Sequence, residues 1–199
     1  HSTVNMASDD KDYIEEILIE GESKMKSALQ VFQSNLNSIR AGRAQPEMLD
    51  PITVTVYEGK KMSIKDLATV SAPEARLLTM TVWDLQNVDV IVKALRESNY
   101  HFNPQVDGPL IRIVIPHLTE ERRQELCKQA KRYTDDCKVA LRNVRKKCSD
   151  DLKALQKEKK ISEDMVKQCM NKPVQKMMDR MMVEAEKKFD QKTKDILTV

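Results

Sequence analysis

The chain has 199 residues, of which 40% are hydrophobic, 33% are charged and 4% are aromatic. This length fits one domain or two small ones, and no run approaches the roughly 20 apolar residues of a membrane-spanning helix, so we expect a soluble protein. With only four glycines and so few aromatic residues, a β-sandwich or β-barrel is disfavoured. The formal net charge of +3 is small, so any polyanion-binding function must depend on how the charge is distributed.

The first predicted helix runs from about residue 9 to residue 39. Its apolar residues recur at seven-residue spacing, which is typical of a coiled-coil-like seam. The seam consists of Met25, Leu29, Phe32, Leu36 and Ile39. Acidic residues near the start favour the positive end of the helix dipole; they are Asp9, Asp10, Asp12, Glu15 and Glu16.

Residues 44–116 differ in kind and predict a small α/β module. Residues 52–57 alternate β-branched and apolar side chains and end at a Glu58-Gly59 turn, which is typical of a strand. Residues 75–82 and 110–115 are further strand candidates, with a short amphipathic helix over 88–98 for which Asn87 is a candidate cap. This segment has seven basic and nine acidic residues.

The second predicted helix covers about residues 119–159, with Thr119 as N-cap and acidic residues in its first turn. At 1.5 Å per residue it is about 60 Å long. Steps of three and four residues draw one apolar or small stripe along it. The stripe comprises Leu126, Ala130, Tyr133, Cys137, Leu141, Val144, Cys148, Leu152 and Leu155.

Positive charge is concentrated on this helix. Residues 122–160 contain fourteen Lys or Arg against six Asp or Glu, so the remainder of the chain is net negative. Four basic residues at helical spacing lie outside the apolar stripe and are expected to share the solvent-facing side of the helix: Lys131, Lys138, Arg142 and Arg145. A stiff rod with a cationic edge suits a polyanion. A solvated helix face is the other interpretation, and charge alone leaves both open.

A third helix follows a short turn, with Ser162 as cap and with Ile161 and Val166 as a hydrophobic staple. So short a link predicts an antiparallel pair. Pro173 lies inside the helix and predicts a kink. The many methionines at helical spacing favour core packing over a promiscuous binding groove. The four cysteines are interpreted as small core residues in a reducing compartment rather than as disulfide partners or metal ligands.

Two adjacent crossings join the helical and α/β parts. The chain leaves through Gly42-Arg43-Ala44 and returns through Ile115-Pro116-His117. Paired crossings with a glycine in one and a proline in the other are typical of a hinge. A rigid junction explains the same residues, and the sequence leaves the two open.

No catalytic motif is found. There is no Gly-rich phosphate loop, no Gly-x-Ser-x-Gly, no His-Glu-x-x-His and no carboxylate pair in an apolar setting. The aspartate pairs of the second helix lie between basic residues and are interpreted as solvated salt-bridging groups. We therefore expect no catalytic residues, no metal, no cofactor and no enzyme activity.

Several segments, taken in order, resemble ribosome recycling factor. They are Ile39-Arg40-Ala41-Gly42-Arg43-Ala44, Leu118-Thr119-Glu120-Glu121-Arg122-Arg123, Val139-Ala140-Leu141-Arg142-Asn143-Val144-Arg145-Lys146 and Lys159-Lys160-Ile161-Ser162-Glu163-Asp164. In the insert, Pro46, Leu49-Asp50, Leu67-Ala68 and Asn103-Pro104 also match. The resemblance covers about residues 10–199. Pro173, the methionine-rich packing and the four cysteines depart from the family pattern.

The resemblance implies an α+β, L-shaped two-domain protein. A long antiparallel three-helix bundle would comprise residues 1–43 and 117–199, and an inserted small α/β (βαβ-type) arm would comprise residues 44–116. The outline would be similar to that of transfer RNA. Family members bind the large ribosomal subunit after termination and, with elongation factor G and GTP, split the post-termination ribosome for recycling.

The same resemblance implies the binding residues. Those expected to contact ribosomal RNA are Arg40, Arg43, Arg122, Arg123, Arg142, Arg145 and Lys146. Those expected at the hinge are Gly42, Arg43, Ala44, Ile115, Pro116 and His117. The expected partners are large-subunit RNA and elongation factor G, with no membrane, and the protein is expected to be a monomer.

Two other functions and two locations stay open. A general RNA-binding helical module would explain the cationic helix but not the insert, and a helical adaptor for an acidic protein would explain the charge without RNA. The first ten residues lack an initiator Met and an intact signal peptide, which fits an organelle import precursor or a cloned fragment. We expect a mitochondrion or plastid, with bacterial cytoplasm as the alternative.

Overall fold

The computed structural model describes residues 8–98, 100 and 102–198. It divides into two compact units. One comprises the chain up to Ile39 together with Glu121–Thr198, and the other comprises Arg40–Glu120. Residues 40–43 and 117–120, which the sequence assigned to the helical part, therefore group with the α/β part. The contacts that hold the two crossings, described below, are the reason.

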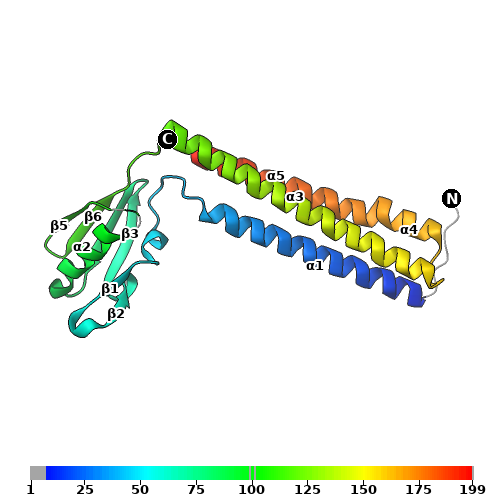
Figure 1. Cartoon of the computed structure of the whole chain (residues 1–199), viewed down its shortest axis with the longest axis horizontal. Helices are drawn as coiled ribbons and strands as arrows, with labels where there is room; N and C mark the ends of the chain where they lie inside the picture. The colour runs from blue at the N-terminus through cyan, green and yellow to red at the C-terminus, as the bar shows by residue number, and fades with distance from the viewer. Residues whose placement is uncertain (1–7, 99, 101, 199) are drawn as a thin grey trace. The chain divides into compact units, whose positions relative to one another are not determined.

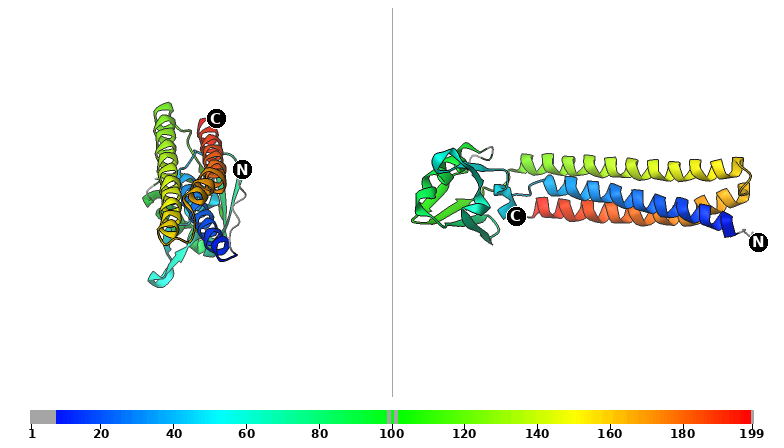
Figure 2. Two further views of the ribbon diagram at one scale, coloured as in Figure 1. Left: turned by 90° about the vertical axis from the view of Figure 1, so that its right-hand side faces the viewer. Right: turned by 90° about the horizontal axis from the view of Figure 1, so that it is seen from below.

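Three long helical segments run side by side in the first unit (Figures 1 and 2). They are α1 (Ser8–Ser38), α3 (Glu120–Lys157) and a third segment made of α4 (Glu163–Cys169), the π-helical turn η5 (Met170–Val174) and α5 (Gln175–Leu197). The Ser162 hydroxyl accepts a hydrogen bond from the Met165 N–H at 3.1 Å, as expected of a helix cap. The short turn between α3 and α4 reverses the chain, so the predicted antiparallel pair is confirmed (Figure 1).

The bundle core is formed by the predicted seams. Met25, Phe32 and Leu36 of α1 are buried, as are Leu141 and Leu152 of α3. The third segment contributes mainly methionines, so their assignment to the core is confirmed: Met165, Met170, Met177, Met178 and Met181 are buried. Cys137, Cys148 and Cys169 are buried free thiols and Cys127 is half-buried, which fits the interpretation of cysteines as small core residues.

The kink expected at Pro173 takes the form of the single π-helical turn Met170–Val174. Proline has no N–H and its ring clashes with the carbonyl four residues earlier in an α-helix. A wider turn with one extra residue relieves both problems, and such turns are a known way for helices to absorb an insertion. The flanking residues Met170 and Val174 stay buried, so the segment keeps its apolar face on the core.

The α/β unit is built on a four-stranded sheet in the order β3-β4-β6-β5, with every neighbouring pair antiparallel. The strands are β3 (Ala68–Glu74), β4 (Leu77–Val82), β5 (Pro104–Asp107) and β6 (Leu110–Val114). Because β4 and β5 both run antiparallel to β6, they are parallel to each other. They are joined through α2 (Val88–Glu97), so the βαβ unit is present in a split form with β6 between its strands.

A two-stranded ribbon of β1 (Thr53–Thr55) and β2 (Lys61–Ser63) completes the unit. The predicted turn between them is present, with Glu58 and Gly59 both at positive φ. Short 3₁₀ turns fill the connections: η1 (Pro46–Leu49), η2 (Tyr57–Gly59), η3 (Ile64–Asp66) and η4 (Leu85–Asn87).

Three strands and one cap differ from the sequence prediction. Strands β2, β3 and β5 were missed: β2 has only three residues, β5 begins at Pro104, and β3 is mostly exposed and contains Pro73. None of these shows a clear apolar alternation. Asn87 makes no side-chain cap hydrogen bond. Instead the Asp84 carboxylate accepts the Gln86 N–H at 3.0 Å, one 3₁₀ turn earlier.

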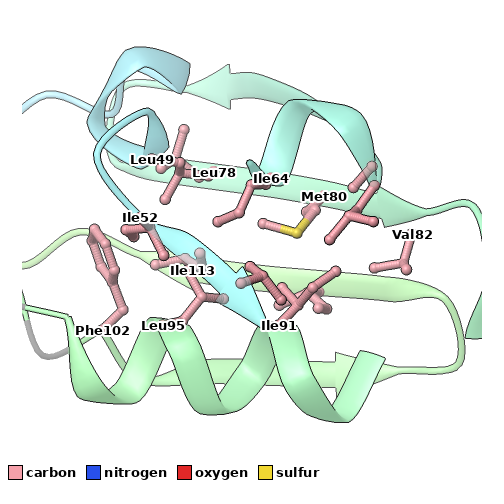
Figure 3. Packing of buried hydrophobic residues seen from close by; sticks show 14 of the residues in the cluster. Leu49, Ile52, Ile64, Leu78, Met80, Val82, Ile91, Leu95, Phe102 and Ile113 are labelled. Carbon is pink, nitrogen blue, oxygen red and sulfur yellow. The ribbon is translucent and has the colours of Figure 1, made fainter. Parts of the chain in front are cut away.

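One face of the sheet carries the core of this unit (Figure 3). Leu78, Met80 and Ile113 from the strands meet Ile91 and Leu95 from α2. Further core residues come from β1, η1, η3 and the segment before β5: Val54, Leu49, Ile52, Ile64 and Phe102. Every residue of this cluster lies between positions 48 and 115, so the unit has a hydrophobic core of its own.

Candidate nucleic-acid interface

Four of the exposed basic residues of α3 form a row along one side of the helix. Arg142 and Lys146 are one turn apart, Lys153 follows seven residues later, and Lys128 lies fourteen residues before Arg142. These intervals are close to whole turns, so the four side chains share one face. All four are exposed and, within the described part of the chain, none makes an ion pair. We call Lys128, Arg142, Lys146 and Lys153 the α3 cationic row.

The predicted stripe of Lys131, Lys138, Arg142 and Arg145 is only partly in this row. Lys138 pairs with Glu186 of α5 and its side chain is only 21% exposed. Arg145 is half-buried, and its Nε donates to Gln175 Oε1 at 3.3 Å. Lys131 pairs with Asp135 at 3.1 Å and lies over the Phe189 ring. Three of the four therefore contact α5 or a neighbouring carboxylate, and Arg142 alone projects freely.

Arg122 and Arg123 belong to a separate place on the same helix. They precede Arg142 by about 20 residues, which corresponds to about 30 Å along an α-helix. Arg122 is exposed and pairs with Glu125 at 2.9 Å. Arg123 is half-buried, and its Nε is buried with no hydrogen-bond partner among the described residues. These two arginines do not join the α3 cationic row.

Arg40 and Arg43 belong to the second unit. Arg40 is half-buried and its Nη1 donates to Gln45 Oε1 at 3.4 Å, while Arg43 is exposed. The seven predicted RNA-binding residues therefore fall into three groups: Arg142, Arg145 and Lys146; Arg122 and Arg123; and Arg40 and Arg43. Within the helical unit, Arg122 and Arg123 do not form one cluster with Arg142, Arg145 and Lys146.

The two crossings are held within the second unit by a common turn. The Ala44 N–H donates to the Ala75 carbonyl and the Ile115 N–H donates to the Arg76 carbonyl, both at 2.7 Å. Gly42, at φ +76°, packs so closely on Leu118 that an added Cβ would lie 2.9 Å from Leu118 Cγ. We call this arrangement the collar: Gly42, Ala44, Ala75, Arg76, Ile115 and Leu118. Of the predicted hinge residues, Ile115 is buried, whereas Arg43, Pro116 and His117 are exposed.

Lys128 and Lys153 are the candidate residues that sequence reasoning missed. Both belong to the α3 cationic row. Their spacing from Arg142, which is close to a whole number of helical turns, could be seen in the sequence. What could not be read was which basic residues are already paired. Lys147, for example, is bound to Asp151 at 2.6 Å, and this hydrogen bond raises the pKa of Lys147.

The exposed cations of the α3 cationic row can pair with anionic groups. Across residues 8–98, 100 and 102–198, no group of three His, Cys, Asp or Glu side chains could hold a metal ion. No helix within those ranges is long and apolar enough to span a membrane. Burial raises the pKa of the Cys137, Cys148 and Cys169 thiols, which disfavours the nucleophilic thiolate form.

Comparison with known proteins gives one consistent result. The family model described as ribosome recycling factor matches residues 32–197. A ribosome-recycling factor from Erythrobacter litoralis (strain HTCC2594) is 44% identical over 177 residues, which are 89% of this chain and 95% of that protein. One from Thermomicrobium roseum (strain ATCC 27502 / DSM 5159 / P-2) is 42% identical over 186 residues, covering 94% of this chain and 100% of that protein.

Solved structures agree with the sequence comparisons. The solution structure of a ribosome recycling factor is 35% identical, with a TM-score of 0.67, covering 94% of this chain and 98% of that one. A second, with 36% identity and a TM-score of 0.58, covers 93% of this chain and 99% of that one. It is described as models for the T. thermophilus ribosome recycling factor and the E. coli elongation factor G bound to the E. coli post-termination complex.

Proposed function

The chain belongs to the ribosome recycling factor family, and from this premise we propose that it recycles ribosomes after termination. It binds the post-termination ribosome and acts with elongation factor G, and hydrolysis of GTP by that factor accompanies separation of the subunits. The observation that carries this function is similarity over most of this chain and nearly the whole of each relative. As a translation factor the protein is not a classical enzyme, and we propose that it performs no covalent chemistry.

Binding to large-subunit RNA is assigned to the α3 cationic row. Arg142 and Lys146 are about 6 Å apart along the helix axis and Lys153 is about 10 Å further, on a rigid rod. Fixed cations at such intervals suit phosphates of a folded RNA, and the planar guanidinium of Arg142 adds bidentate hydrogen bonding and stacking. Arg145 supports the row from the α5 side, where Gln175 holds its Nε.

The remaining predicted RNA contacts have supporting roles in this proposal. Arg122 and Arg123 would contact RNA about 30 Å from the row, and Arg40 and Arg43 would do so from the second unit. Because the collar fixes Ala44, Ile115 and Leu118 within that unit, we place bending between Ile39 and Gly42 in one crossing and between Leu118 and α3 in the other. This shifts the hinge outward from Gly42-Arg43-Ala44 and Ile115-Pro116-His117.

Binding is tested by sedimentation with isolated large ribosomal subunits across a salt series. Arg142→Gln and Lys146→Gln should each weaken binding and lower the slope of log affinity against log salt by roughly 0.7–0.9 per lost phosphate contact. Lys176→Gln, an exposed lysine on α5, is the matched control and should bind like the parent. Equal binding by all variants would remove the row from the interface.

The function itself is tested by subunit splitting. Post-termination ribosomes with elongation factor G and GTP should separate only when the protein is added, as followed by light scattering. A general RNA-binding module would instead bind any duplex RNA with comparable affinity and would not split ribosomes. An adaptor for an acidic protein would keep its ribosome association after ribonuclease treatment.

We infer that the protein works where ribosomes of the bacterial type translate. The bacterial relatives support bacterial cytoplasm, while location in a mitochondrion or plastid is our alternative proposal. Fractionation of the source cells with an antibody against the chain separates the two. Recovery of the protein with organelle ribosomes would establish location in an organelle. Absence of the protein from the organelle fractions would exclude that location.

A further inference from the structure

One face of the four-stranded sheet is covered by the core, and the other faces solvent. Cross-strand partners share a face of a sheet, so the register identifies the residues of the open face. One row across the strands is Ser71, Thr79, Arg112 and Gln105. The next row is Thr69, Thr81, Leu110 and Asp107, and a third is Glu74, Leu77 and Val114. We call these residues, with Trp83, the open sheet face.

Its composition is unlike the rest of this surface. The chain has 34 Lys or Arg residues, yet the open sheet face has no lysine and a single arginine. Threonines, a serine and a glutamine make up nearly half of it, and Val114 is 61% exposed. Surfaces that bind proteins are characteristically depleted of lysine and enriched in tryptophan and arginine. An ordinary solvated sheet face would explain the threonines but not an exposed tryptophan.

Trp83 is the tryptophan in question, and it is 63% exposed. It follows the buried Val82 at the end of β4, so alternation along the strand turns it to the open side. Its indole Nε1–H donates to the Thr69 hydroxyl at 2.9 Å. The ring is therefore held in place with its only donor already used, and it presents a rigid apolar surface. Such a surface binds by burial and packing.

Arg112 lies near the centre of the face without a counter-charge. Its direct neighbours across β4 and β5 are Thr79 and Gln105, both neutral. In the described part of the chain no carboxylate forms an ion pair with its guanidinium. The Thr79 hydroxyl is itself bonded to Ser71 at 2.7 Å. An exposed arginine with neutral cross-strand neighbours can bind a bidentate carboxylate from another protein.

We propose that the open sheet face is a docking surface for a protein that packs an apolar side chain on Trp83 and a carboxylate on Arg112. Charge favours protein over RNA: residues 44–116 have seven basic and nine acidic residues. One arginine, flanked at the margins by Asp107 and Glu74, is too little positive charge to hold a phosphate backbone. It is sufficient for one charge-assisted pair beside an aromatic contact.

This inference rests on the proposed function, because the partner is sought on the post-termination ribosome. Trp83 is replaced by a photo-crosslinking phenylalanine analogue, and the full chain is bound to post-termination ribosomes with elongation factor G and a non-hydrolysable GTP analogue. The complex is sedimented, irradiated and digested, and crosslinked peptides and nucleotides are identified by mass spectrometry. The same analogue at Tyr57, which is 83% exposed in the β1–β2 turn, gives the background.

The expected result is a protein crosslink from position 83 well above the Tyr57 background, at a segment containing Asp or Glu. A crosslink from position 83 to ribosomal RNA would overturn the inference. So would a yield no greater than that at Tyr57 in complexes that sediment normally. Failure to sediment with ribosomes would instead overturn the proposed function, so the two failures are distinguishable.

A second pair of variants tests the carboxylate. Arg112→Gln should lower the position-83 crosslink yield and slow subunit splitting several-fold while large-subunit binding through α3 stays unchanged. Arg96→Gln makes the same charge change on α2, which packs on the covered face, and should behave like the parent. Because Arg112 is exposed, its replacement leaves the core intact. Equal yields and rates for the two variants would overturn the role of Arg112.

Discussion

At the scale of single residues, Gly21 of α1 lies at a close approach of the three helices. A Cβ there would lie 2.7 Å from the Cys148 Sγ of α3 and 3.5 Å from the Met177 Cε of α5. Glycine inside a helix normally costs about 1 kcal/mol relative to alanine. Its presence here is explained by the approach of the three helices, because a Cβ at this position would force the Cys148 side chain to move.

Gly21→Ala should therefore destabilise the bundle in spite of its better helix propensity. Overpacking costs about 1–3 kcal/mol, so we expect a net loss of about 1 kcal/mol in the free energy of unfolding, measured with urea. In a Cys148→Ala background the obstructing sulfur is absent, and Gly21→Ala should become neutral or stabilising. A loss of equal size in both backgrounds would contradict the packing explanation.

The buried thiols make stability depend on pH in the alkaline range. Burial raises the pKa of Cys137, Cys148 and Cys169, so the native state keeps these protons to higher pH than the unfolded chain. The protonated buried thiols contribute fully to stability below the pKa of a thiol in the unfolded chain, about 8.5. This contribution is lost as the pH rises above that value, because the unfolded chain then loses protons that the native state retains. The free energy of unfolding should fall from pH 8 to pH 10, and replacing all three cysteines with alanine should make that fall shallower.

At the scale of secondary-structure elements, the collar explains why the crossings belong to the α/β unit. The turn at Ala75-Arg76 between β3 and β4 provides a carbonyl to each crossing, and Gly42 and Leu118 pack directly together. These contacts fasten both crossings to the turn between β3 and β4. The bending proposed above is therefore placed between the collar and the helix ends.

Gly42 and Gly59 provide a matched test of the collar, because both have φ +76°. Alanine at either position incurs the cost of left-handed backbone, about 1–2 kcal/mol. Only Gly42→Ala also meets Leu118, since nothing lies within 4 Å of a Cβ at Gly59. By thermal unfolding, Gly42→Ala should be the more destabilising by about 1 kcal/mol, and Leu118→Ala should remove the difference. Equal effects at the two glycines would mean that the contact is unimportant.

At the scale of the whole molecule, charge and core are divided between the units. Residues 122–160 are strongly basic, whereas residues 44–116 are slightly acidic. The α3 cationic row and the open sheet face accordingly suit different partners, one a polyanion and the other a protein surface. Each unit also has its own buried apolar cluster, so mutations in one core need not weaken the other.

Residues 40–120 should fold when excised. Their core cluster lies entirely between Met48 and Ile115, and a domain of this size can bury enough surface to be marginally stable. We expect a single cooperative urea transition of a few kcal/mol and dispersed amide resonances. Ile113→Ala, at a fully buried position, should abolish folding of the fragment. A fragment without a cooperative transition would show that its stability depends on the helical unit.

The sequence by itself determined the helical elements and the family. Seven-residue seams, the Ser162 cap and the apolar stripe of α3 are local patterns whose period matches the helix, so they could be read directly. The concentration of basic residues over 122–160 likewise needs no structure. Even the form of the irregularity at Pro173 was half predictable, because proline cannot continue an α-helix.

Tertiary structure alone decided which basic side chains are exposed and unpaired, and so available to bind a partner. Lys138 and Arg145 were expected to be free, but α5 lies beside them and occupies both with Glu186 and Gln175. Strand β3 could not be read because edge strands with exposed residues lack alternation. The collar joins residues more than 30 positions apart through backbone groups, which carry no signal in side-chain identity. Contacts between distant residues depend on how the elements pack together. Local sequence patterns do not reveal that packing.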